Sequence, residues 1–279
     1  MHLITLIENS MGREGLTNEF GFSLHIEANG RRVLFDTGQS STFVQNAAKL
    51  NVDLSAVDLA VLSHGHYDHG GGLGAFFAAN ATAPLFLRTT ADGEYYAKLP
   101  VGERYIGLDR DVLQANRTRL RWVGEDTEIA PGLHALTSIP DVERRPHTED
   151  RLMAKQGGAL VPDRFGHELA LVVREDDGIA VITGCGHLGV LNMVLAAKRR
   201  FPEEPIKAAI GGFHLMSNPT AGEMAGTPAD VEAVARRFKE LGCQRVISGH
   251  CTGKQASAIL MRALKDDYLE LSTGMAFEV

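Results

Sequence analysis

Residues 63–72 read Ser63-His64-Gly65-His66-Tyr67-Asp68-His69-Gly70-Gly71-Gly72 and follow directly on the apolar run Leu59-Ala60-Val61-Leu62. This stretch places three of the 11 histidines of the chain, and one aspartate, close together. Imidazole and carboxylate groups are ligands for zinc, iron and manganese. So many ligand-type side chains in one loop indicate a metal site, and the rest of the chain has to supply the ligands that the loop lacks.

Three further histidines follow predicted strands in the same manner. After apolar runs, the chain continues with Gly184-Cys185-Gly186-His187, with Gly211-Gly212-Phe213-His214 and with Gly249-His250-Cys251. In layered α/β folds, the ends of strands gather functional groups on a rigid frame. We therefore expect these three loops and residues 63–72 to meet at one pocket.

The spacing within residues 63–72 is typical of a site for two ions. His64 and His66 are two apart in extended chain and point to the same side, so that they can bind one ion. Asp68 and His69 lie beyond a turn and can bind a second. Two ions about 3.5–4 Å apart polarise a substrate oxygen and lower the pKa of bound water. The candidates for the missing ligands are His187, His214, His250 and Cys185.

The remaining pattern predicts a single α/β domain over residues 1–279. Predicted strands cover 2–8, 20–28, 31–36, 58–63, 84–88, 168–173, 178–183, 206–210 and 244–248, and predicted helices include 73–79, 188–200 and 228–241. Asn29-Gly30 is a two-residue hairpin signal. The segment 139–167 is charged and irregular, which indicates a long loop or flap near the site.

The composition is that of an ordinary globular chain, with 279 residues, 44% hydrophobic and 23% charged. A formal net charge of −7 argues against binding to a nucleic-acid backbone. No apolar run approaches the roughly 18 residues that a membrane span needs, and the N-terminus lacks the features of a signal peptide. The three cysteines form no CxxC pair, so we expect a cytoplasmic protein without a disulfide framework.

Several of these segments together carry a resemblance to a known family. HGHYDH (64–69) matches the HxHxDH signature of the metallo-β-lactamase superfamily, and Asp36-Thr37-Gly38 resembles its first motif. Within that superfamily, DTGQS, LSHGHYDHGGGL, ITGCGH, GGFHL and GHCTG are similar to the 7,8-dihydropterin-6-methyl-4-(β-D-ribofuranosyl)aminobenzene-5′-phosphate synthase-like group. The resemblance extends over nearly the whole chain.

The resemblance implies a four-layer αββα sandwich, in which two mixed sheets lie face to face with helices outside. It implies two divalent ions, zinc first, with iron or manganese as alternatives. His64, His66 and His187 would bind the first ion, and Asp68, His69 and His250 the second.

Three further residues are placed by the same resemblance. Asp36 would support the histidine loop from below through a hydrogen bond. Cys185 stands where most members have a bridging aspartate, and it is either a thiolate ligand or a small buried residue. For His214, a substrate-binding or acid/base role and metal ligation are the alternatives. We interpret five other histidines as ordinary surface or core residues: His2, His25, His134, His147 and His167.

Three functions follow from this site. The first is a metal-dependent hydrolase, in which a metal-bound hydroxide attacks an ester, phosphoester, lactone or amide and Asp68 and His214 are the catalytic residues. The second is a synthase that joins a pterin to a ribosyl-aminobenzene phosphate. The third is a metal-dependent binding module without turnover. The expected partner is a small molecule, phosphorylated in the synthase alternative, and the chain is expected to be a monomer or homodimer.

Overall fold

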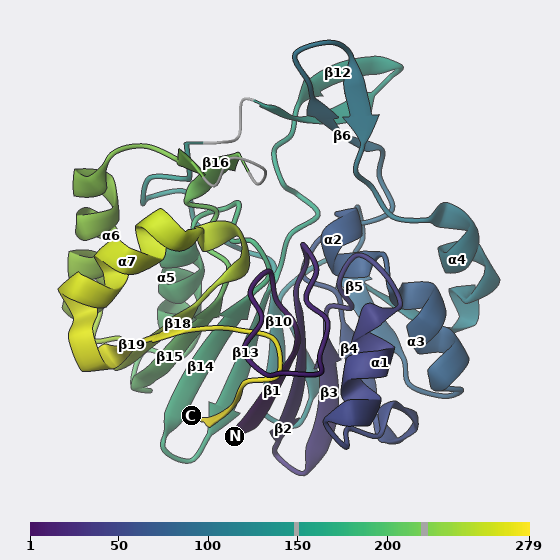
Figure 1. Ribbon diagram of the computed structural model, residues 1–279, viewed down its shortest axis with the longest axis horizontal. Helices are drawn as coiled ribbons and strands as arrows, with labels where there is room; N and C mark the ends of the chain where they lie inside the picture. The colour runs from purple at the N-terminus through teal and green to yellow at the C-terminus, as the bar shows by residue number, and fades with distance from the viewer. Residues whose placement is uncertain (148–150, 219–222) are drawn as a thin grey trace. The chain divides into compact units, whose positions relative to one another are not determined.

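The computed structural model describes residues 1–147, 151–218 and 223–279, and these form two compact units (Figure 1). The first unit takes its described residues from 1–124, 149–168 and 272–278. The second takes them from 125–148, 169–271 and residue 279. Each unit is therefore assembled from separate stretches of the chain. That both belong to a single domain stays a prediction.

The first unit is built on a seven-stranded mixed sheet. Its strands, in spatial order, are β20 (Ala276–Glu278), β1 (His2–Ile7), β2 (Ser23–Ala28), β3 (Arg31–Phe35), β4 (Leu59–Val61), β5 (Leu85–Arg88) and β8 (Leu120–Val123). The first three neighbouring pairs along this order are antiparallel, and the pairs from β3 to β8 are parallel. Asn29 and Gly30, with φ of 52° and 70°, form the expected tight turn between β2 and β3.

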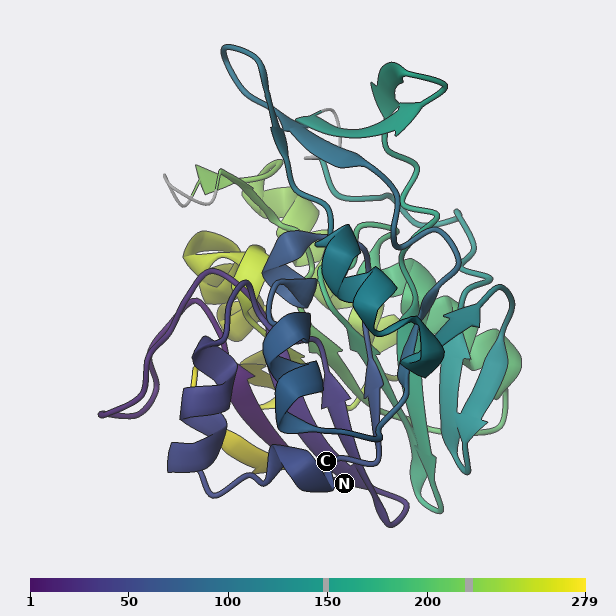
Figure 2. The same cartoon turned by 90° about the vertical axis from the view of Figure 1, so that its right-hand side faces the viewer.

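Helices cover one face of this sheet (Figures 1 and 2). They are α1 (Thr42–Lys49) and α3 (Leu73–Ala79), and two shorter helices, α2 (Tyr67–Gly70) and α4 (Arg110–Ala115), belong to the same unit. Phe43 of α1 and Phe76 of α3 are fully buried in one core with Leu34 and Leu85 of the sheet. The bounds of α3 are those that the sequence predicts, because its apolar residues recur at helical spacing directly after the glycine run.

The second unit has its own seven-stranded mixed sheet. In spatial order its strands are β19 (Tyr268–Glu270), β18 (Arg245–Ser248), β15 (Ile206–Gly211), β14 (Gly178–Thr183), β13 (Ala170–Glu175), β10 (Leu133–Leu136) and β9 (Thr127–Ala130). The strands from β14 to β19 run parallel, and the pairs from β14 to β9 are antiparallel. The carboxyl ends of β14, β15 and β18 therefore meet at one edge of the sheet.

Three helices pack on this second sheet: α5 (Val190–Arg200), α6 (Pro228–Glu240) and α7 (Lys254–Leu264). The start of α6 is fixed by a capping box, in which Thr227 and Asp230 each hydrogen-bond the other's backbone N–H, and Pro228 is the first helical residue. Val231, Ala235 and Phe238 of α6 are buried in the core, as their helical spacing predicts.

The expectation of an irregular flap at 139–167 is wrong for part of that segment. Its described residues include β11 (Leu152–Gln156) and β12 (Ala159–Pro162), which form a small sheet with β6 (Tyr95–Lys98) and β7 (Glu103–Tyr105). Gly157 and Gly158 make the turn, with φ of 58° and 86°. Because β11 pairs with β6, far away in the sequence, no local pattern indicated these strands. Residues 148–150 of the segment lie outside the described residues.

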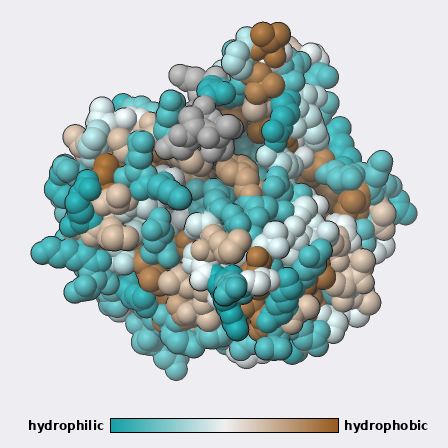
Figure 3. All heavy atoms as spheres, in the orientation of Figure 1, coloured by the Kyte–Doolittle hydropathy of each residue, from teal (hydrophilic) through white to brown (hydrophobic). Residues whose placement is uncertain are grey.

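The small sheet exposes apolar side chains at its tip. Figure 3 shows an apolar group there, where the β6–β7 turn leaves Val101 90% exposed and Leu99 44% exposed. A two-stranded piece, β16 (Met216–Asn218) with β17 (Glu223–Met224), belongs to the second unit. Among the described residues, no helix combines the length and the apolar character needed to cross a bilayer.

Candidate functional site

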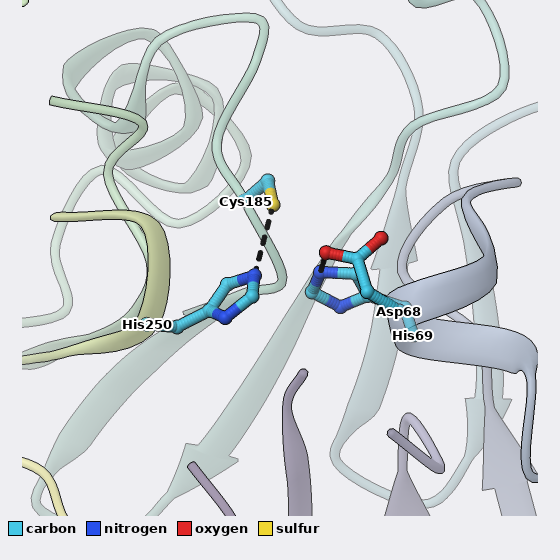
Figure 4. A group of neighbouring side chains, drawn as sticks. All are labelled: Asp68, His69, Cys185 and His250. Atoms are coloured by element: carbon cyan, nitrogen blue, oxygen red, sulfur yellow. Dashed lines mark hydrogen bonds and ion pairs between the residues drawn. The ribbon is translucent and has the colours of Figure 1, made fainter. Parts of the chain in front are cut away.

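In the first unit, four ligand-type side chains lie in the turn that follows β4. His64 and His66 come directly after the strand, and Asp68 and His69 belong to the short helix α2. All four are buried, and the most exposed of them, Asp68, has 6% of its surface accessible. Figure 4 shows Asp68 and His69 side by side on this helix, with 3.5 Å between Asp68 Oδ2 and His69 Nε2. The turn therefore holds two imidazoles before the helix and an imidazole with a carboxylate within it.

Asp36 fixes this turn from the end of the neighbouring strand β3. Its Oδ1 accepts a hydrogen bond from the backbone N–H of Ser63 at 2.7 Å, and its Oδ2 accepts one from the Ser63 hydroxyl, also at 2.7 Å. Nδ1 of His69 lies 2.7 Å from the same Oδ2. A histidine whose Nδ1 is held by a carboxylate presents Nε2 to a ligand, and such contacts fix the ring orientation of metal ligands.

The two histidines before α2 are also in a state suited to metal binding. Nδ1 of His64 lies 2.8 Å from the Ser63 hydroxyl, so its buried Nε2 is the nitrogen that can face an ion. Burial lowers the pKa of His66 to about 3, and the neighbouring His167 adds to the effect. His66 is therefore neutral at pH 7, and the neutral imidazole is the form that binds metals.

His167, treated in the sequence as an ordinary histidine, lies against this turn. Its Nδ1 accepts a hydrogen bond from the N–H of Gly65 at 2.9 Å, and its Nε2 lies 3.0 Å from Asp163 Oδ2. Burial alone would raise the pKa of Asp163, but the hydrogen bond from His167 brings it below the usual value. His66, Asp163 and His167 offer ligand atoms within 4.8 Å of one another. Since both ring nitrogens of His167 are engaged, the arrangement positions the loop through Gly65.

In the second unit, the remaining candidates lie at the edge where β14, β15 and β18 end. Cys185 and His187 follow β14, His214 follows β15, and His250 begins the short 3-10 helix after β18 (His250–Thr252). Because the three strands are parallel neighbours, their loops come together within this unit. Cys185, His187 and His250 are each no more than 3% exposed, and His214 is half-buried.

Two contacts join these loops in pairs. Nε2 of His250 lies 3.4 Å from Sγ of Cys185, as Figure 4 shows, and the rings of His187 and His214 are 4.2 Å apart between centroids. His214 and His250 both have left-handed backbone, with φ of 49° and 51°. For a residue other than glycine this conformation costs about 1–2 kcal/mol, and such strain gathers at functional sites.

Cys251, which the sequence did not indicate, is part of the same cluster. Its sulfur accepts a hydrogen bond from the backbone N–H of His214 at 3.3 Å. Cys185, His214 and Cys251 offer ligand atoms that all lie within 4.8 Å of one another. The signal that could have found Cys251 is its place beside His250 in the loop after β18.

The chemistry of these donors fits a metal ion of the zinc or iron class. The first unit supplies buried imidazoles and a carboxylate, and the second supplies imidazoles and thiols, which are the ligand types such ions take. In addition, the buried Nδ1 of His214 has no hydrogen-bond partner among the described residues. A buried polar atom left this way is costly unless something binds it.

The other histidines lie in ordinary surroundings. Nδ1 of His2 lies 2.6 Å from Glu278, and His147 lies near Asp230 at the surface. His25 and His134 are buried within β2 and β10, where burial lowers the pKa of each. None of these four lies in the groups of potential ligands found among the described residues.

Comparison of the sequence with known proteins shows a match to a family. The sequence model of the metallo-beta-lactamase superfamily matches residues 16–191, which include the first ligand set, Cys185 and His187. The chain is also similar to 7,8-dihydropterin-6-methyl-4-(beta-D-ribofuranosyl)-aminobenzene-5′-phosphate synthase of Methanocaldococcus jannaschii. The two are 29% identical over 269 residues, covering 91% of this chain and 87% of the relative.

Solved structures give the same result for the fold. A metal-dependent hydrolase of the beta-lactamase superfamily superposes with a TM-score of 0.84 at 33% identity, covering 100% of this chain and 99% of that one. The Zn²⁺-bound protein PqqB of Methylobacterium extorquens superposes with a TM-score of 0.59 at 10% identity, covering the whole of both chains. At 10% identity the second likeness is one of fold alone.

Proposed function

The chain belongs to the metallo-β-lactamase superfamily, and from this membership we propose that it is a metal-dependent hydrolase of a small ester, phosphoester, lactone or amide. Its fold is the metallo-β-lactamase fold expected from the sequence. The observation that carries the proposal is the Asp36 contact, because three donors from Ser63 and His69 converge on one buried carboxylate. Such a contact fixes the ring orientation of a metal-ligating histidine.

We assign the ligands by combining the family with the geometry of each unit. His64, His66 and His187 are proposed for the first ion, and Asp68, His69 and His250 for the second. In the first unit Nδ1 of His64 lies beside the Ser63 hydroxyl and Nδ1 of His69 beside the Asp36 carboxylate, so Nε2 is the nitrogen that we propose as the ligand atom in both. Zinc is the first choice of metal, because imidazole and carboxylate ligands suit it.

The side chains of the site are proposed to have distinct roles in the reaction. When bound, the ions would polarise a substrate oxygen and lower the pKa of water. Asp68 is proposed to orient the attacking water through its carboxylate, which α2 holds next to His69. For His214, acid/base work and metal ligation remain the alternatives. The buried surroundings of these groups exclude bulk water and strengthen their electrostatic effect on the substrate.

A second candidate function is a synthase, favoured by one observation. The similarity to the Methanocaldococcus jannaschii synthase extends over 91% of this chain. In this alternative the same ligands would serve the joining of a dihydropterin to a ribofuranosyl-aminobenzene 5′-phosphate. The hydrolase is placed first because its relative superposes over the whole chain at 33% identity.

The experiment is a substrate screen with a matched pair of variants. Generic phosphodiesters, lactones and thioesters are offered to wild-type protein, to His66→Ala and to His25→Ala, which also removes one buried imidazole of the first unit. We expect turnover of at least one class by wild type and His25→Ala, and a loss of at least about 100-fold in His66→Ala. Equal turnover by His66→Ala and His25→Ala would reject the hydrolase.

The synthase is tested with the same three proteins. A 7,8-dihydropterin and the ribofuranosyl-aminobenzene phosphate are incubated with each, and the joined product is measured by mass spectrometry. We would conclude that the protein is a synthase and not a hydrolase if wild type forms the product, His66→Ala does not, and the screen shows no hydrolysis. Metal-dependent binding of these compounds without turnover of either kind would reject both enzymes.

A further inference from the structure

The second unit contains a cavity that the proposed metal centre does not use. Its volume is about 420 Å³, within the range of roughly 300–1,000 Å³ that small-molecule sites occupy. It is bounded by α5 and α6, which are labelled in Figure 1, by the segment 143–147 and by the chain that follows β15. None of the candidate metal ligands of this unit is among the described residues that line it. The cavity is therefore a second concave site within the same unit.

The wall of this cavity is mostly apolar. Its apolar lining residues include Val190 and Leu191 from α5, Phe213 and Leu215 from the chain after β15, and Ala233 and Val234 from α6. Phe213 and Val190 also belong to the core of the unit, so this wall is part of the packed structure. Water against such a wall is poorly held, and an apolar group that replaces it gains free energy.

Asn192, in the first turn of α5, fixes one edge of the cavity. Its Oδ1 accepts hydrogen bonds from the N–H of Glu143 at 2.8 Å and of Val142 at 3.2 Å. Its Nδ2 donates to the carbonyls of Glu143 at 3.0 Å and of Leu188 at 2.8 Å. A Cβ at Gly189 would lie 2.9 Å from this Nδ2, so the glycine leaves room for the contact. The edge is thus formed before any ligand binds, which lowers the cost of binding.

The rim of the cavity carries an excess of positive charge. Four arginines and three carboxylate residues line it, namely Arg144, Arg145, Arg236 and Arg237 with Glu143, Asp230 and Glu240. Arg237 contacts both Glu143, at 2.7 Å, and Glu240, at 3.1 Å. Arg144 contacts Asp230 at 3.1 Å. All three carboxylates are therefore engaged, and one arginine is left over when His147, which also lines the cavity, is neutral.

Arg236 is the arginine whose charge is not matched. It lies on α6 and lines the cavity, and no hydrogen bond or ion pair joins it to another of the residues that the structure describes. Arg145, by contrast, is held by Asp141 at 3.0 Å. A guanidinium group binds a carboxylate through two parallel N–H donors. Arg236 thus provides a site for one carboxylate at the rim of an apolar cavity.

We propose that this cavity binds a small amphipathic carboxylate, with its apolar body against the wall and its carboxylate on Arg236. One negative charge on the ligand matches the one positive charge that the rim has to spare. The apolar body contributes affinity in proportion to the area that it removes from water. A small anion without an apolar body would leave the wall unfilled, and a cation would meet the unmatched Arg236. The site goes beyond the proposed hydrolase and does not depend on it.

The test measures binding of octanoate to the whole protein by isothermal titration calorimetry. Octanoate is chosen because its flexible chain adapts to the shape of an apolar cavity. Two further probes separate its parts: 1-octanol has the same length without the charge, and butanoate has the charge with a chain four carbons shorter. We expect saturable binding of one octanoate per chain. Both 1-octanol and butanoate should bind at least about tenfold more weakly.

Three variants locate the binding in this cavity. Arg236→Gln should weaken octanoate binding about tenfold and leave 1-octanol unchanged, because it removes the charge alone. Arg262→Gln is the matched control, since Arg262 is an exposed arginine on α7 that does not line the cavity. It should bind octanoate as wild type does. Ala233→Trp fills the cavity from α6 and should weaken octanoate and 1-octanol alike, by at least about tenfold.

The site would be overturned by any of three results. These are no saturable octanoate binding in wild type, equal affinities in Arg236→Gln and Arg262→Gln, or an unchanged affinity in Ala233→Trp. Ala233 and Arg236 are both exposed on α6, and circular dichroism melts check that each variant folds. His66→Ala separates this site from the proposed function. It should bind octanoate as wild type does while it loses turnover, so that either proposal can fail without the other.

Discussion

At the scale of single residues, the structure describes the surroundings of the histidine turn, while the ligand roles of its side chains stay a prediction. His64, His66, Asp68 and His69 are all buried and follow β4. Cys251, Asp163 and His167 were missed. A cysteine and an aspartate with no motif around them look like any core residue, and their roles depend on partners from distant parts of the sequence.

His25 allows a pH prediction that does not depend on metal. It is 3% exposed in β2, and burial lowers its pKa below that of a histidine in water. In the unfolded chain this histidine binds a proton near pH 6.5, whereas in the folded chain it stays neutral at that pH. Because only the unfolded chain gains the proton, the free energy of unfolding falls as the pH drops below about 6.5. The contribution of one such group is up to about 1.4 kcal/mol per pH unit.

The measurement compares wild type with His25→Phe by urea unfolding between pH 7 and pH 5, in the presence of a chelator. Wild type should lose more stability over this range than the variant, which has no proton to bind at that position. The absolute stability of the variant does not matter, since only the slopes are compared. Parallel slopes for the two proteins would contradict the account of His25.

At the scale of helices and strands, elements whose signals are local were predicted well. The helix at 73–79, the hairpin at Asn29-Gly30 and the start of α6 at Pro228 depend on neighbours within a few residues. The strands β11, β12 and β20 were missed. β20 pairs with β1 at the opposite end of the chain, and β11 pairs with β6, so their formation depends on long-range pairing.

His167, in the segment before β13, contacts the turn at 63–70, so its replacement should weaken that turn. In His167→Ala, the N–H of Gly65 and the carboxylate of Asp163 lose a buried hydrogen-bond partner. We expect about 1–3 kcal/mol of lost stability and a metal affinity lowered roughly 10- to 100-fold. Chelator competition measures the affinity, and urea unfolding measures the stability.

His134→Ala is the matched control. His134 is also buried, but it lies in β10 of the second unit, where it contacts Phe201 and Glu128. It should leave the metal affinity of the histidine turn unchanged. If His167→Ala binds metal as tightly as this control, the supporting role is wrong. If it loses one ion completely, His167 is a ligand instead.

At the scale of the whole molecule, the family explains why one sequence motif predicted so much. Each unit presents strand ends with histidines, and the superfamily match and the TM-score of 0.84 to a solved hydrolase show the fold that the motif implied. The substrate does not follow in the same way. One fold carries many chemistries, and the relatives at about 30% identity are named as a synthase and a hydrolase.

The central claim is that the two ligand sets bind metal, and the most direct measurement is elemental analysis of protein purified without added metal. Wild type should contain two or more divalent ions per chain, with zinc the most abundant. His66→Ala should contain at least one ion fewer, while His25→Ala should match wild type. One ion or less per chain in wild type, or equal metal content in wild type and His66→Ala, would contradict the account.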